Sequence, residues 1–486
     1  MLFNSYIFIL LFLPISILGY YLFNKFEKKR MADVFLIVMS LWFYGYYNPS
    51  YLLVICTSIV VNYGISRILS GRNDSIVYRF LLTLGVLGNI IVIFYFKYYD
   101  FFIRNVNKAF GMSFELKHIL LPLGISFFTF QQISYLVDSF RGETKDYGFI
   151  EYALFVCFFP QLIAGPIVLH NETIPQFRDV SKRKINFESL SHGLYCFAIG
   201  LFKKVLIADT FSRAVTWGFG DANAALTSME TLIVSLCYTF QIYFDFSGYC
   251  DMAIGIGKMF NIEIPQNFNS PYKANSILDF WNRWHMSLTR FLRQYVYYPL
   301  GGSKKGTVRT YINVMIVFLV SGIWHGANGT FIVWGVLHGI CNCLNRIMKK
   351  SWEKMNYVFQ WGITFFIVNI LWVFFRADYI GQAVQMIKNM LSLTDLSYTT
   401  ELINCFRIPE IEFLEKYNIV QETLSKLPGL WMWGFIGMAF WIVLNCKNVQ
   451  EREFSGNWIQ SVSVVLMMTW SIMSLSGVSE FLYFGF

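Results

Sequence analysis

The chain has 486 residues, of which 56% are hydrophobic and only 14% are charged, and its mean hydropathy is +0.47. A soluble domain carries about 25% charged residues, so this composition excludes an ordinary soluble protein and favours a chain embedded in a membrane. The formal net charge of +9 fits loops that face anionic lipid headgroups. Because the basic residues are spread between apolar segments, the charge gives no support for nucleic-acid binding.

Apolar segments that approach the length of a transmembrane helix recur from one end of the chain to the other. Crossing the hydrocarbon core takes about 20 mostly apolar residues. The segments concerned are 2–24, 32–47, 51–67, 79–103, 119–138, 188–205, 228–250, 310–324, 329–346, 358–375, 429–445 and 457–475. The sequence therefore predicts an all-α, polytopic integral membrane protein with about 11–12 transmembrane helices, forming a single domain over residues 1–486.

Basic residues in short loops predict which loops face the cytoplasm. The first apolar segment is followed by KFEKKR (Lys25–Arg30) and not by a small-residue cleavage site, so we expect a span and not a cleaved signal peptide. Further basic groups on the same side are Arg67, Arg72 and Arg79; Arg141 and Lys145; Ser181–Lys184; and Arg346, Lys349, Lys350 and Lys354. The apolar stretch Phe149–Val168 lies between two of these groups. Because both groups are predicted to face the cytoplasm, this stretch should enter the bilayer and return to the same side. Pro160 suits a broken, protein-buried segment.

The nine cysteines lie mostly within apolar segments, and their spacing does not resemble a zinc site. We therefore interpret them as small apolar packing residues and expect no metal. The sequence contains no Walker loop and no dinucleotide-binding glycine pattern. No permanently bound cofactor is predicted.

Polar residues gather in the centre of the chain, between about residues 120 and 340. Polar groups inside a membrane are costly, so a cluster of them favours a functional site. Asp138 lies in one predicted span and Asp245 in another, within QIYFDFSGYCDM. Either aspartate could orient a histidine or could hold helices together, and the structural use is the commoner one. We expect the site in the centre and scaffold at both ends.

The segment FWNRWHMSLTRFLRQYVYYPLGG (Phe280–Gly302) is dense in basic and aromatic residues. We place it on one continuous helix at about 100° per residue. The apolar arc is then Trp281, Trp284, Leu288, Phe291 and Leu292; the polar side is Asn282, Arg283, Arg290 and Arg293; and His285 lies on the border. Two interpretations stay open. The arginines either reach lipid phosphates from an interfacial helix, or bind the phosphates of an anionic cytosolic substrate, to which Lys304 and Lys305 would contribute.

A second histidine-bearing segment, VSGIWHGANGT (Val320–Thr330), lies between two apolar spans. Glycines on both sides of His325 allow the backbone to break and other helices to approach closely. A neutral imidazole in a desolvated site can act as a general base, because desolvation disfavours its charged form. A helix–helix hydrogen bond would instead give His325 a structural role. We expect such a packing role for His338, one helix further on.

Several motifs, in order along nearly the whole chain, resemble one known family. They are Gln241–Tyr272, FWNRWHMSLTRFLRQYVYYPLGG, LVSGIWHGANGTFIVWGVLHG, Pro122–Gly142, Phe158–Ile167, Gly200–Asp209, Trp372–Asp378 and Phe481–Phe486. The chain resembles the membrane-bound O-acyltransferase family, in the bacterial branch of the alginate O-acetylation membrane protein. This resemblance implies transmembrane, re-entrant and interfacial helices around a central cavity.

The resemblance also implies a reaction, in which an acyl group passes from a cytosolic thioester donor to an acceptor across the membrane. The family's invariant histidine falls on His325 and its second histidine on His285. For this branch the implied donor substrate is acetyl-coenzyme A. The implied partners are an extracytoplasmic protein of the SGNH acetyltransferase or esterase type and a polysaccharide as final acceptor. The family's usual residues near the end are replaced by Glu480 and Gly485, which leaves the role of this end open.

Residues and resemblance combine into one hypothesis for the site. His325 acts as general base for an acceptor hydroxyl, with direct acylation of His325 as an alternative. His285 and Asn282 position the donor or assist proton transfer. The other expected donor contacts are Arg283, Arg290, Arg293, Lys304, Lys305, Trp324 and Asp245.

This hypothesis divides the domain into N-terminal scaffold helices (1–118), a catalytic core (119–346) and C-terminal helices (347–486). A loop at about 379–428 either docks the acceptor partner or is a plain surface loop. The expected location is the bacterial plasma (inner) membrane, crossed many times. Two alternatives stay open: D-alanyl transfer to teichoic acid from a carrier protein, and a transporter or flippase. The latter also uses broken helices and buried polar groups, but it predicts inverted repeats, and each histidine motif occurs once.

Overall fold

The computed structural model describes residues 1–70, 75–144, 146–220, 226–414, 416–417, 427–475 and 481–482. Within these ranges every regular element is a helix, so the all-α fold is confirmed. The helices that are long and apolar enough to cross a membrane are Phe8–Lys25, Ser50–Leu69, Ile76–Phe110, Thr307–His325 and Tyr357–Arg376. The protein is a polytopic membrane protein, and the total of about 11–12 spans stays a prediction.

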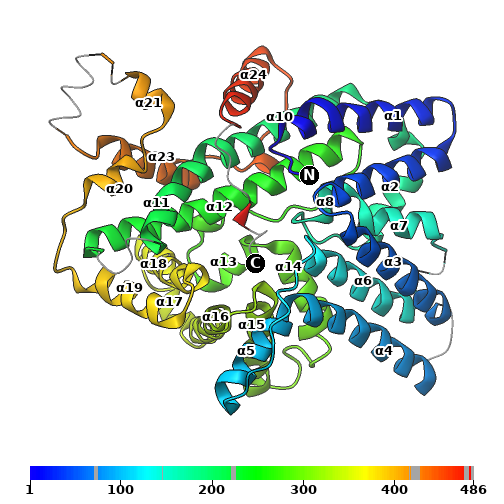
Figure 1. Ribbon diagram of the computed structural model, residues 1–486, viewed down its shortest axis with the longest axis horizontal. Helices are drawn as coiled ribbons and strands as arrows, with labels where there is room; N and C mark the ends of the chain where they lie inside the picture. Colours follow the sequence, from blue (N-terminus) through cyan, green and yellow to red (C-terminus); the bar gives the residue numbers. More distant parts are fainter. Residues whose placement is uncertain are drawn as a thin grey trace.

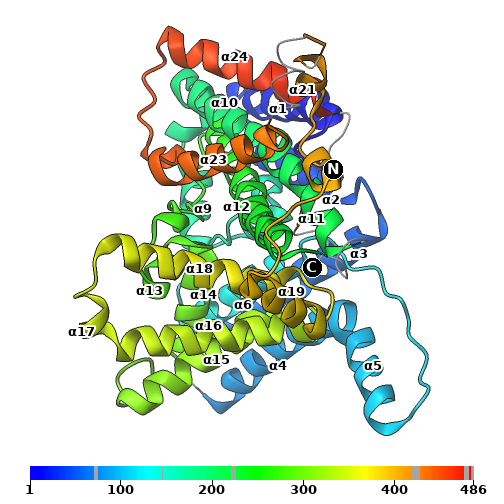
Figure 2. The ribbon, with the colours of Figure 1, turned by 90° about the vertical axis from the view of Figure 1, so that its left-hand side faces the viewer.

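Apart from the last of them, the N-terminal helices form one side of the molecule (Figure 1). They are η1 (Phe8–Phe12), α1 (Leu13–Lys25), α2 (Lys29–Gly45), α3 (Ser50–Leu69), α4 (Ile76–Ile93), η2 (Phe94–Tyr98) and α5 (Tyr99–Phe110). Helices α3 and α4 pack against α6 (Ile125–Phe140) of the central region. Helix α5 stands away from the rest of the molecule (Figure 2). The predicted span 79–103 therefore bends at η2, a π-helical turn between two α-helices.

The central helix of the molecule is α12 (Ser228–Met259), which is buried over most of its length (Figure 1). Its neighbours include α10 (Phe187–Phe202), α11 (Asp209–Phe219) and the turn η4 (Lys203–Ala208). Paired glycines bring α10 and α12 together, because a Cβ on Gly193 or Gly200 would lie 2.5 Å from a main-chain oxygen of α12. Small residues at such crossings let helix backbones pack closely in membranes.

The stretch Phe149–Val168 is broken and buried, as the sequence predicted. Helix α7 (Phe149–Cys157) ends before Pro160, α8 (Phe159–Leu162) is a single short turn, and residues 163–169 are not helical. Every residue from 152 to 170 is buried. Protein therefore surrounds this non-helical backbone, the condition under which irregular structure is tolerated at membrane depth.

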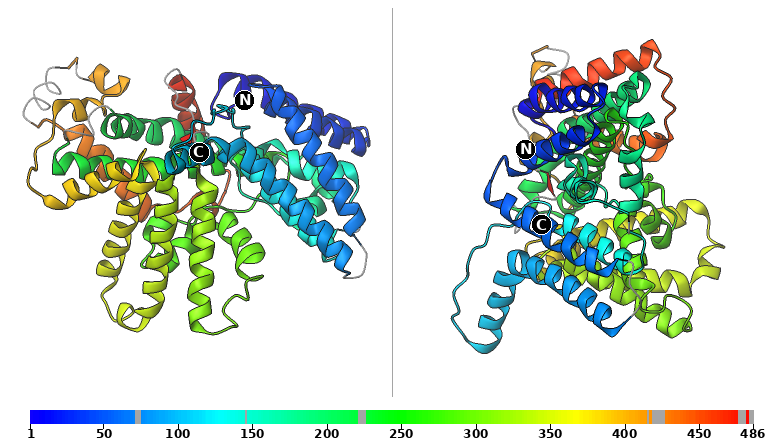
Figure 3. Two further views of the ribbon diagram at one scale, coloured as in Figure 1. Left: turned by 60° about the horizontal axis from the view of Figure 1, so that its bottom comes forward. Right: turned by 90° about the vertical axis from the view of Figure 1, so that its right-hand side faces the viewer.

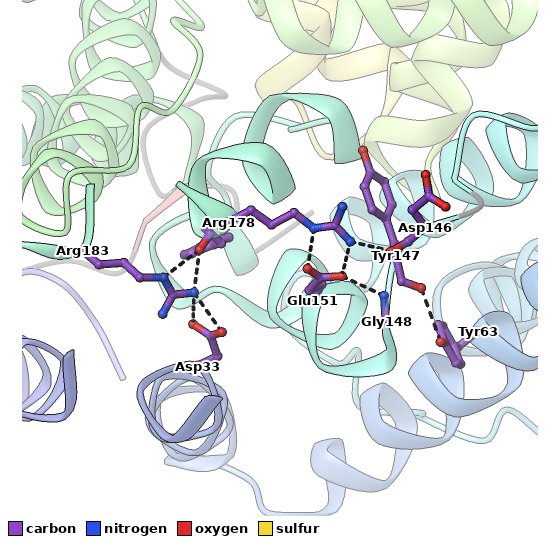
Figure 4. A network of polar contacts seen from close by, with 9 residues as sticks. Asp33, Tyr63, Asp146, Tyr147, Gly148, Glu151, Arg178 and Arg183 are labelled. Atoms are coloured by element: carbon purple, nitrogen blue, oxygen red, sulfur yellow. Dashed lines mark hydrogen bonds and ion pairs between the residues drawn. The ribbon is translucent and has the colours of Figure 1, made fainter. Parts of the chain in front are cut away.

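A polar network joins the helices near the predicted cytoplasmic loops (Figure 4). Arg178, the last residue of α9 (His170–Arg178), lies 2.5 Å from Glu151 of α7. Arg183, in the short turn η3 (Ser181–Arg183), lies 2.8 Å from Asp33 of α2. Part of the basic charge that the sequence assigned to the cytoplasmic face thus forms structural ion pairs. Arg72 and Lys145, assigned to the same face, lie outside the described residues.

The second half of the chain supplies the remaining helices. They are η5 (Pro271–Lys273), α13 (Ile277–Arg283), α14 (Met286–Leu292), η6 (Arg293–Tyr297), α15 (Thr307–His325), α16 (Gly329–Ile347), α17 (Lys349–Trp352), α18 (Tyr357–Arg376), α19 (Ile380–Ser392), α20 (Thr400–Asn404), α21 (Pro409–Leu414), α23 (Leu430–Asn445), η7 (Val449–Glu451) and α24 (Trp458–Met473). Helices α15, α16 and α18 run side by side (Figures 2 and 3). Residues 415 and 418–426 of the region 379–428 lie outside the described residues; the described part contains α19, α20 and α21, and α19 packs against α12. The role of this region as a docking site for a partner stays a prediction.

Candidate active site

The basic segment does not form the single helix that the sequence predicted. Helix α13 ends at Arg283 and α14 begins at Met286, with a corner between them at His285. The backbone of His285 is left-handed, with φ 46° and ψ 52°, a conformation that costs a residue with a Cβ about 1–2 kcal/mol. His285 is also fully buried and does not lie on a surface border. Helical periodicity missed this corner because the residues on both sides keep helical spacing.

Asn267 holds the corner in place. Its main-chain oxygen accepts a hydrogen bond from the Met286 amide at 2.9 Å. Its Oδ1 accepts hydrogen bonds from the Ser287 amide at 3.1 Å and the Ser287 hydroxyl at 2.9 Å. The same oxygen lies 3.1 Å from Nδ1 of His285. Since a carbonyl oxygen only accepts, Nδ1 donates, which leaves Nε2 as the nitrogen that can accept a proton.

Asn267 was not among the predicted site residues, although it lies inside the motif Gln241–Tyr272. Asn267 lies among other polar residues, in QNFNS (Gln266–Ser270), so local composition did not distinguish it. Because Asn267 is completely buried and binds three consecutive residues of the corner, it determines where His285 points. Such surroundings are needed to maintain a strained backbone at a functional site.

His325 is the last residue of α15 and is surrounded by aromatic rings. Its ring centroid lies 4.8 Å from that of Trp324, 5.1 Å from Trp334 and 5.0 Å from Phe375. The next residue, Gly326, is extended, and a Cβ there would lie 2.1 Å from the ring of Phe331. The glycine therefore breaks the helix directly after the histidine, as the sequence predicted.

The two predicted catalytic histidines come together in the structure. The ring centroids of His285 and His325 are 6.4 Å apart. Trp324 lies beside both, with centroid distances of 5.9 Å to His285 and 4.8 Å to His325. Within the described part of the chain, the buried indole N–H of Trp324 has no hydrogen-bond partner. A histidine pair with an available donor beside it can transfer a proton and stabilise developing charge on oxygen.

Lys97 of η2 also belongs to this centre, although it was not among the predicted site residues. Its ammonium group donates hydrogen bonds to the main-chain oxygens of Trp324 at 2.7 Å and His325 at 3.0 Å. A lysine within a predicted span (79–103) was a signal that could have identified it, because charge inside a membrane usually marks function.

Two cavities with polar residues adjoin α15 at different heights. One, of about 120 Å³, lies along the middle of the helix and is lined by apolar residues together with polar ones that include Asn282, Arg293, Asn342 and Arg346. The other, of about 550 Å³, lies at the carboxyl end and is lined by Lys97, Arg376 and Asp378 among others. The first cavity is mostly apolar with a few polar groups, as small-molecule sites typically are, whereas the second carries several charged side chains.

Comparison with known proteins assigns the family. Residues 94–380 match the family model described as MBOAT, membrane-bound O-acyltransferase family. The chain belongs to the membrane-bound O-acyltransferase family. The matched range contains Lys97, His285 and His325, and the protein is an acyltransferase.

Proteins with named activities are similar to all or about half of this acyltransferase. A peptidoglycan O-acetyltransferase from Helicobacter pylori is 39% identical, over 100% of this chain and 98% of the relative. A probable alginate O-acetylase, AlgI, from Pseudomonas putida is 39% identical over 100% of both chains. A teichoic acid D-alanyltransferase from Bacillus subtilis is 29% identical, over 49% of this chain and 61% of the relative.

The predicted donor contacts of the acyltransferase separate into two groups. Asn282 and Arg293 line the cavity along α15. Arg290 instead forms an ion pair with Glu172 and donates to the main-chain oxygen of residue 167 at 3.0 Å. Arg283 pairs with Asp279 at 2.9 Å. Both guanidinium groups thus have carboxylate partners, and their contact with a donor stays a prediction.

Lys304 and Lys305 are exposed in the turn before α15. They lie at the end of α15 opposite to His325. A helix of 19 residues spans about 28 Å, so these lysines are suited to the outer part of a donor and not to its reacting end.

Asp245 does not orient a histidine. Its carboxylate accepts hydrogen bonds from the Lys204 ammonium at 2.7 Å and from the Leu482 amide at 3.1 Å. A buried ion pair of this kind links α12, η4 and the end of the chain, which is the structural role that the sequence analysis considered commoner. Leu482 also lines the larger cavity, whereas Glu480 and Gly485 lie outside the described residues.

Asp138 lies beside a histidine other than the predicted pair. It lies 3.3 Å from Nε2 of His170 and accepts a hydrogen bond from the Tyr295 hydroxyl at 2.6 Å. Asp138, Glu143 and His170 place possible metal ligands within 4.8 Å of one another. The Arg141 guanidinium, 3.1 Å from Asp138, already supplies the positive charge there. The arrangement therefore favours a structural network between α6, α9 and η6.

His338 packs between helices, as the sequence predicted. Its Nδ1 accepts a hydrogen bond from the indole N–H of Trp281 at 3.2 Å. The helices α15 and α16 approach closely beside it, since a Cβ on Gly322 or Gly335 would lie 2.5 Å from a main-chain oxygen of the other helix. This crossing fixes α16 and its aromatic residues against His325.

Proposed function

We propose that the acyltransferase moves an acetyl group from cytosolic acetyl-coenzyme A to an extracytoplasmic acceptor, for O-acetylation of a cell-envelope polysaccharide. The observation that carries the proposal is the pair His285 and His325, 6.4 Å apart, with one polar cavity along α15 and another at its end. An enzyme whose two substrates come from opposite faces of the membrane needs an opening from each face to the same reacting centre.

The relatives favour acetyl over D-alanyl transfer. The peptidoglycan and alginate relatives match the whole chain at 39% identity, whereas the D-alanyltransferase matches about half at 29%. A transporter or flippase is disfavoured, because the family and these relatives transfer acyl groups. Peptidoglycan and alginate are equally supported as acceptors by identity, so the proposal is limited to polysaccharide.

In the proposed reaction His325 removes the proton from the acceptor hydroxyl as its oxygen attacks the thioester carbonyl. The new C–O bond forms and the C–S bond breaks. The proton then passes from His325 to the departing coenzyme A thiolate, which leaves as the thiol. General base catalysis of this kind contributes about 10²–10⁴-fold. His285, held by Asn267, positions the thioester, and the Trp324 indole N–H is suited to stabilise the charge on its oxygen.

The donor enters along the cavity lined by Asn282 and Arg293 in this proposal. Arg293 is exposed, so its guanidinium can contact a phosphate without breaking an ion pair. Lys304 and Lys305 lie on the same side and attract the remaining phosphates. Arg290 and Arg283 hold the segment in place through their carboxylate partners, and Trp324 contacts the acyl end.

The acceptor enters through the larger cavity at the end of α15. We propose that it is presented by an extracytoplasmic protein of the SGNH type, which passes the acetyl group to the polysaccharide. The region 379–428 contributes to docking this partner. The proposed location is the bacterial inner membrane, where cytosolic acetyl-coenzyme A and an extracytoplasmic acceptor lie on opposite sides.

The proposal is tested with inverted membrane vesicles from cells that make the protein, since these expose the cytosolic face and keep the partners. Acetyl-coenzyme A labelled in its acetyl group is added outside, and label is measured in the polysaccharide fraction. Label should accumulate there and stay absent in vesicles that lack the protein. Transfer from a D-alanyl carrier protein but not from acetyl-coenzyme A would overturn the proposal. So would movement of a lipid or solute without loss of the thioester.

A further inference from the structure

The end of α15, which carries His325, is held by two neighbouring side chains of η2. The Lys97 ammonium donates to the oxygens of Trp324 at 2.7 Å and His325 at 3.0 Å. The Tyr98 hydroxyl donates to the oxygen of Ile323 at 2.5 Å. The last three carbonyls of the helix therefore all bind side chains that lie more than 200 residues earlier in the chain.

Helix ends have carbonyls without partners inside the helix, and the carboxyl end carries partial negative charge. A lysine satisfies both needs, because it offers several donors and a full positive charge. The π-helical turn η2 places consecutive residues, Lys97 and Tyr98, on the same helix end. Turns of this kind inside α-helices occur frequently at functional sites.

Lys97 also lies between two cavities. It lines a small one, of about 30 Å³, together with Trp324 and His325. It lines as well the cavity of about 550 Å³ that contains Arg376 and Asp378. Lys97 therefore lies at the boundary between the larger cavity and the space beside His325.

We propose that Lys97 is the positioning residue of His325: by binding the last two carbonyls of α15, it fixes the imidazole opposite His285 where an acceptor hydroxyl arrives from the larger cavity. This inference rests on the proposed function. A catalytic group displaced by about 1 Å can lose about 10²-fold in rate, so a residue that sets the end of α15 affects turnover without contacting the donor. The N-terminal region 1–118 then supplies part of the site and is more than a scaffold.

The test compares Lys97→Met, which keeps the length but removes the donors and charge, with Lys97→Arg, which keeps both. For Lys97→Met we expect kcat to fall about 30–100-fold with the KM for acetyl-coenzyme A unchanged. Lys97→Arg should recover most of that loss. Rates are expressed per folded protein, so that a purely structural effect appears in the folded fraction and not in kcat. An unchanged kcat in Lys97→Met, or an equal loss in both variants, would overturn the inference.

Lys117→Met is the matched control, because Lys117 lies over the rings of Tyr95 and Tyr99 near the same helices and should retain the wild-type kcat. Hydrogen exchange of residues 320–328 gives a readout that does not depend on turnover. Exchange there should become faster in Lys97→Met and stay unchanged in Lys117→Met. If the wild type does not consume acetyl-coenzyme A, the proposed function fails. In that case, unchanged exchange in Lys97→Met overturns the positioning role as well.

Discussion

The two histidines of this acyltransferase are held by opposite means. His285 lies at a strained corner between two short helices and is fixed by hydrogen bonds through Asn267. His325 lies at the end of a long helix, packed among aromatic rings that come from α15, α16 and α18. Hydrogen bonds define both the orientation and the tautomer of an imidazole, whereas ring packing defines its place. The difference suits His285 to positioning and His325 to accepting and returning a proton.

The largest effect should come from His325→Ala. Removing the proposed general base should lower acetyl transfer about 10²–10⁴-fold, measured as label transferred from acetyl-coenzyme A in membrane vesicles. His192→Ala is the matched control, because His192 stacks on Phe454 at 5.0 Å, away from the histidine pair, and should keep wild-type transfer. A folded His325→Ala protein with normal transfer would show that the ring-packed histidine is not the base.

Asn267→Ala should have the next largest effect, because it releases the corner that carries His285. Its loss leaves buried partners on His285 and Ser287 unsatisfied, which costs about 1–3 kcal/mol of stability. We expect a lower melting temperature and a fall in kcat of about 10-fold or more, since a catalytic constellation depends on geometry. Asn267→Ala with both values unchanged would mean that the hydrogen bonds do not position His285.

Gly326→Ala tests the tight packing around His325. The added Cβ would lie 2.1 Å from the Phe331 ring, so the ring must move, and overpacking of this kind costs about 1–3 kcal/mol. The melting temperature in detergent should fall, whereas Gly88→Ala, with nothing within 4 Å of its added Cβ, should not lower it. Equal melting temperatures for the two variants would contradict the tight packing after His325.

The smallest effect is expected at the donor cavity. Arg293→Ala should raise the KM for acetyl-coenzyme A about 2–5-fold, the range for a solvent-exposed ion pair, with kcat unchanged. Arg290→Ala should instead lower the melting temperature, because it leaves Glu172 without its cation. If Arg290→Ala changes the KM and Arg293→Ala does not, Arg290 contacts the donor and Arg293 does not.

Much of the fold could be predicted from the sequence, because apolar segment length and loop charge follow directly from the bilayer as solvent. The broken stretch near Pro160, the packing role of His338 and the glycine break after His325 were predicted by local chemistry alone. The corner at His285 was not, since a single left-handed residue leaves the surrounding periodicity intact. Asn267 and Lys97 were missed because their partners lie 18 or more residues away in the chain.

The sequence by itself determined the class of protein, the family and the two histidines that fall in its motifs, since these depend on composition and on contiguous motifs. Only the tertiary structure decided which polar side chains reach them. Arg290 and Asp245 have partners on other helices, while Arg293 lines a cavity and Lys97 binds the end of α15. The physical reason is that a buried polar group must find a partner, and helix packing, not chain order, determines which partner lies within reach.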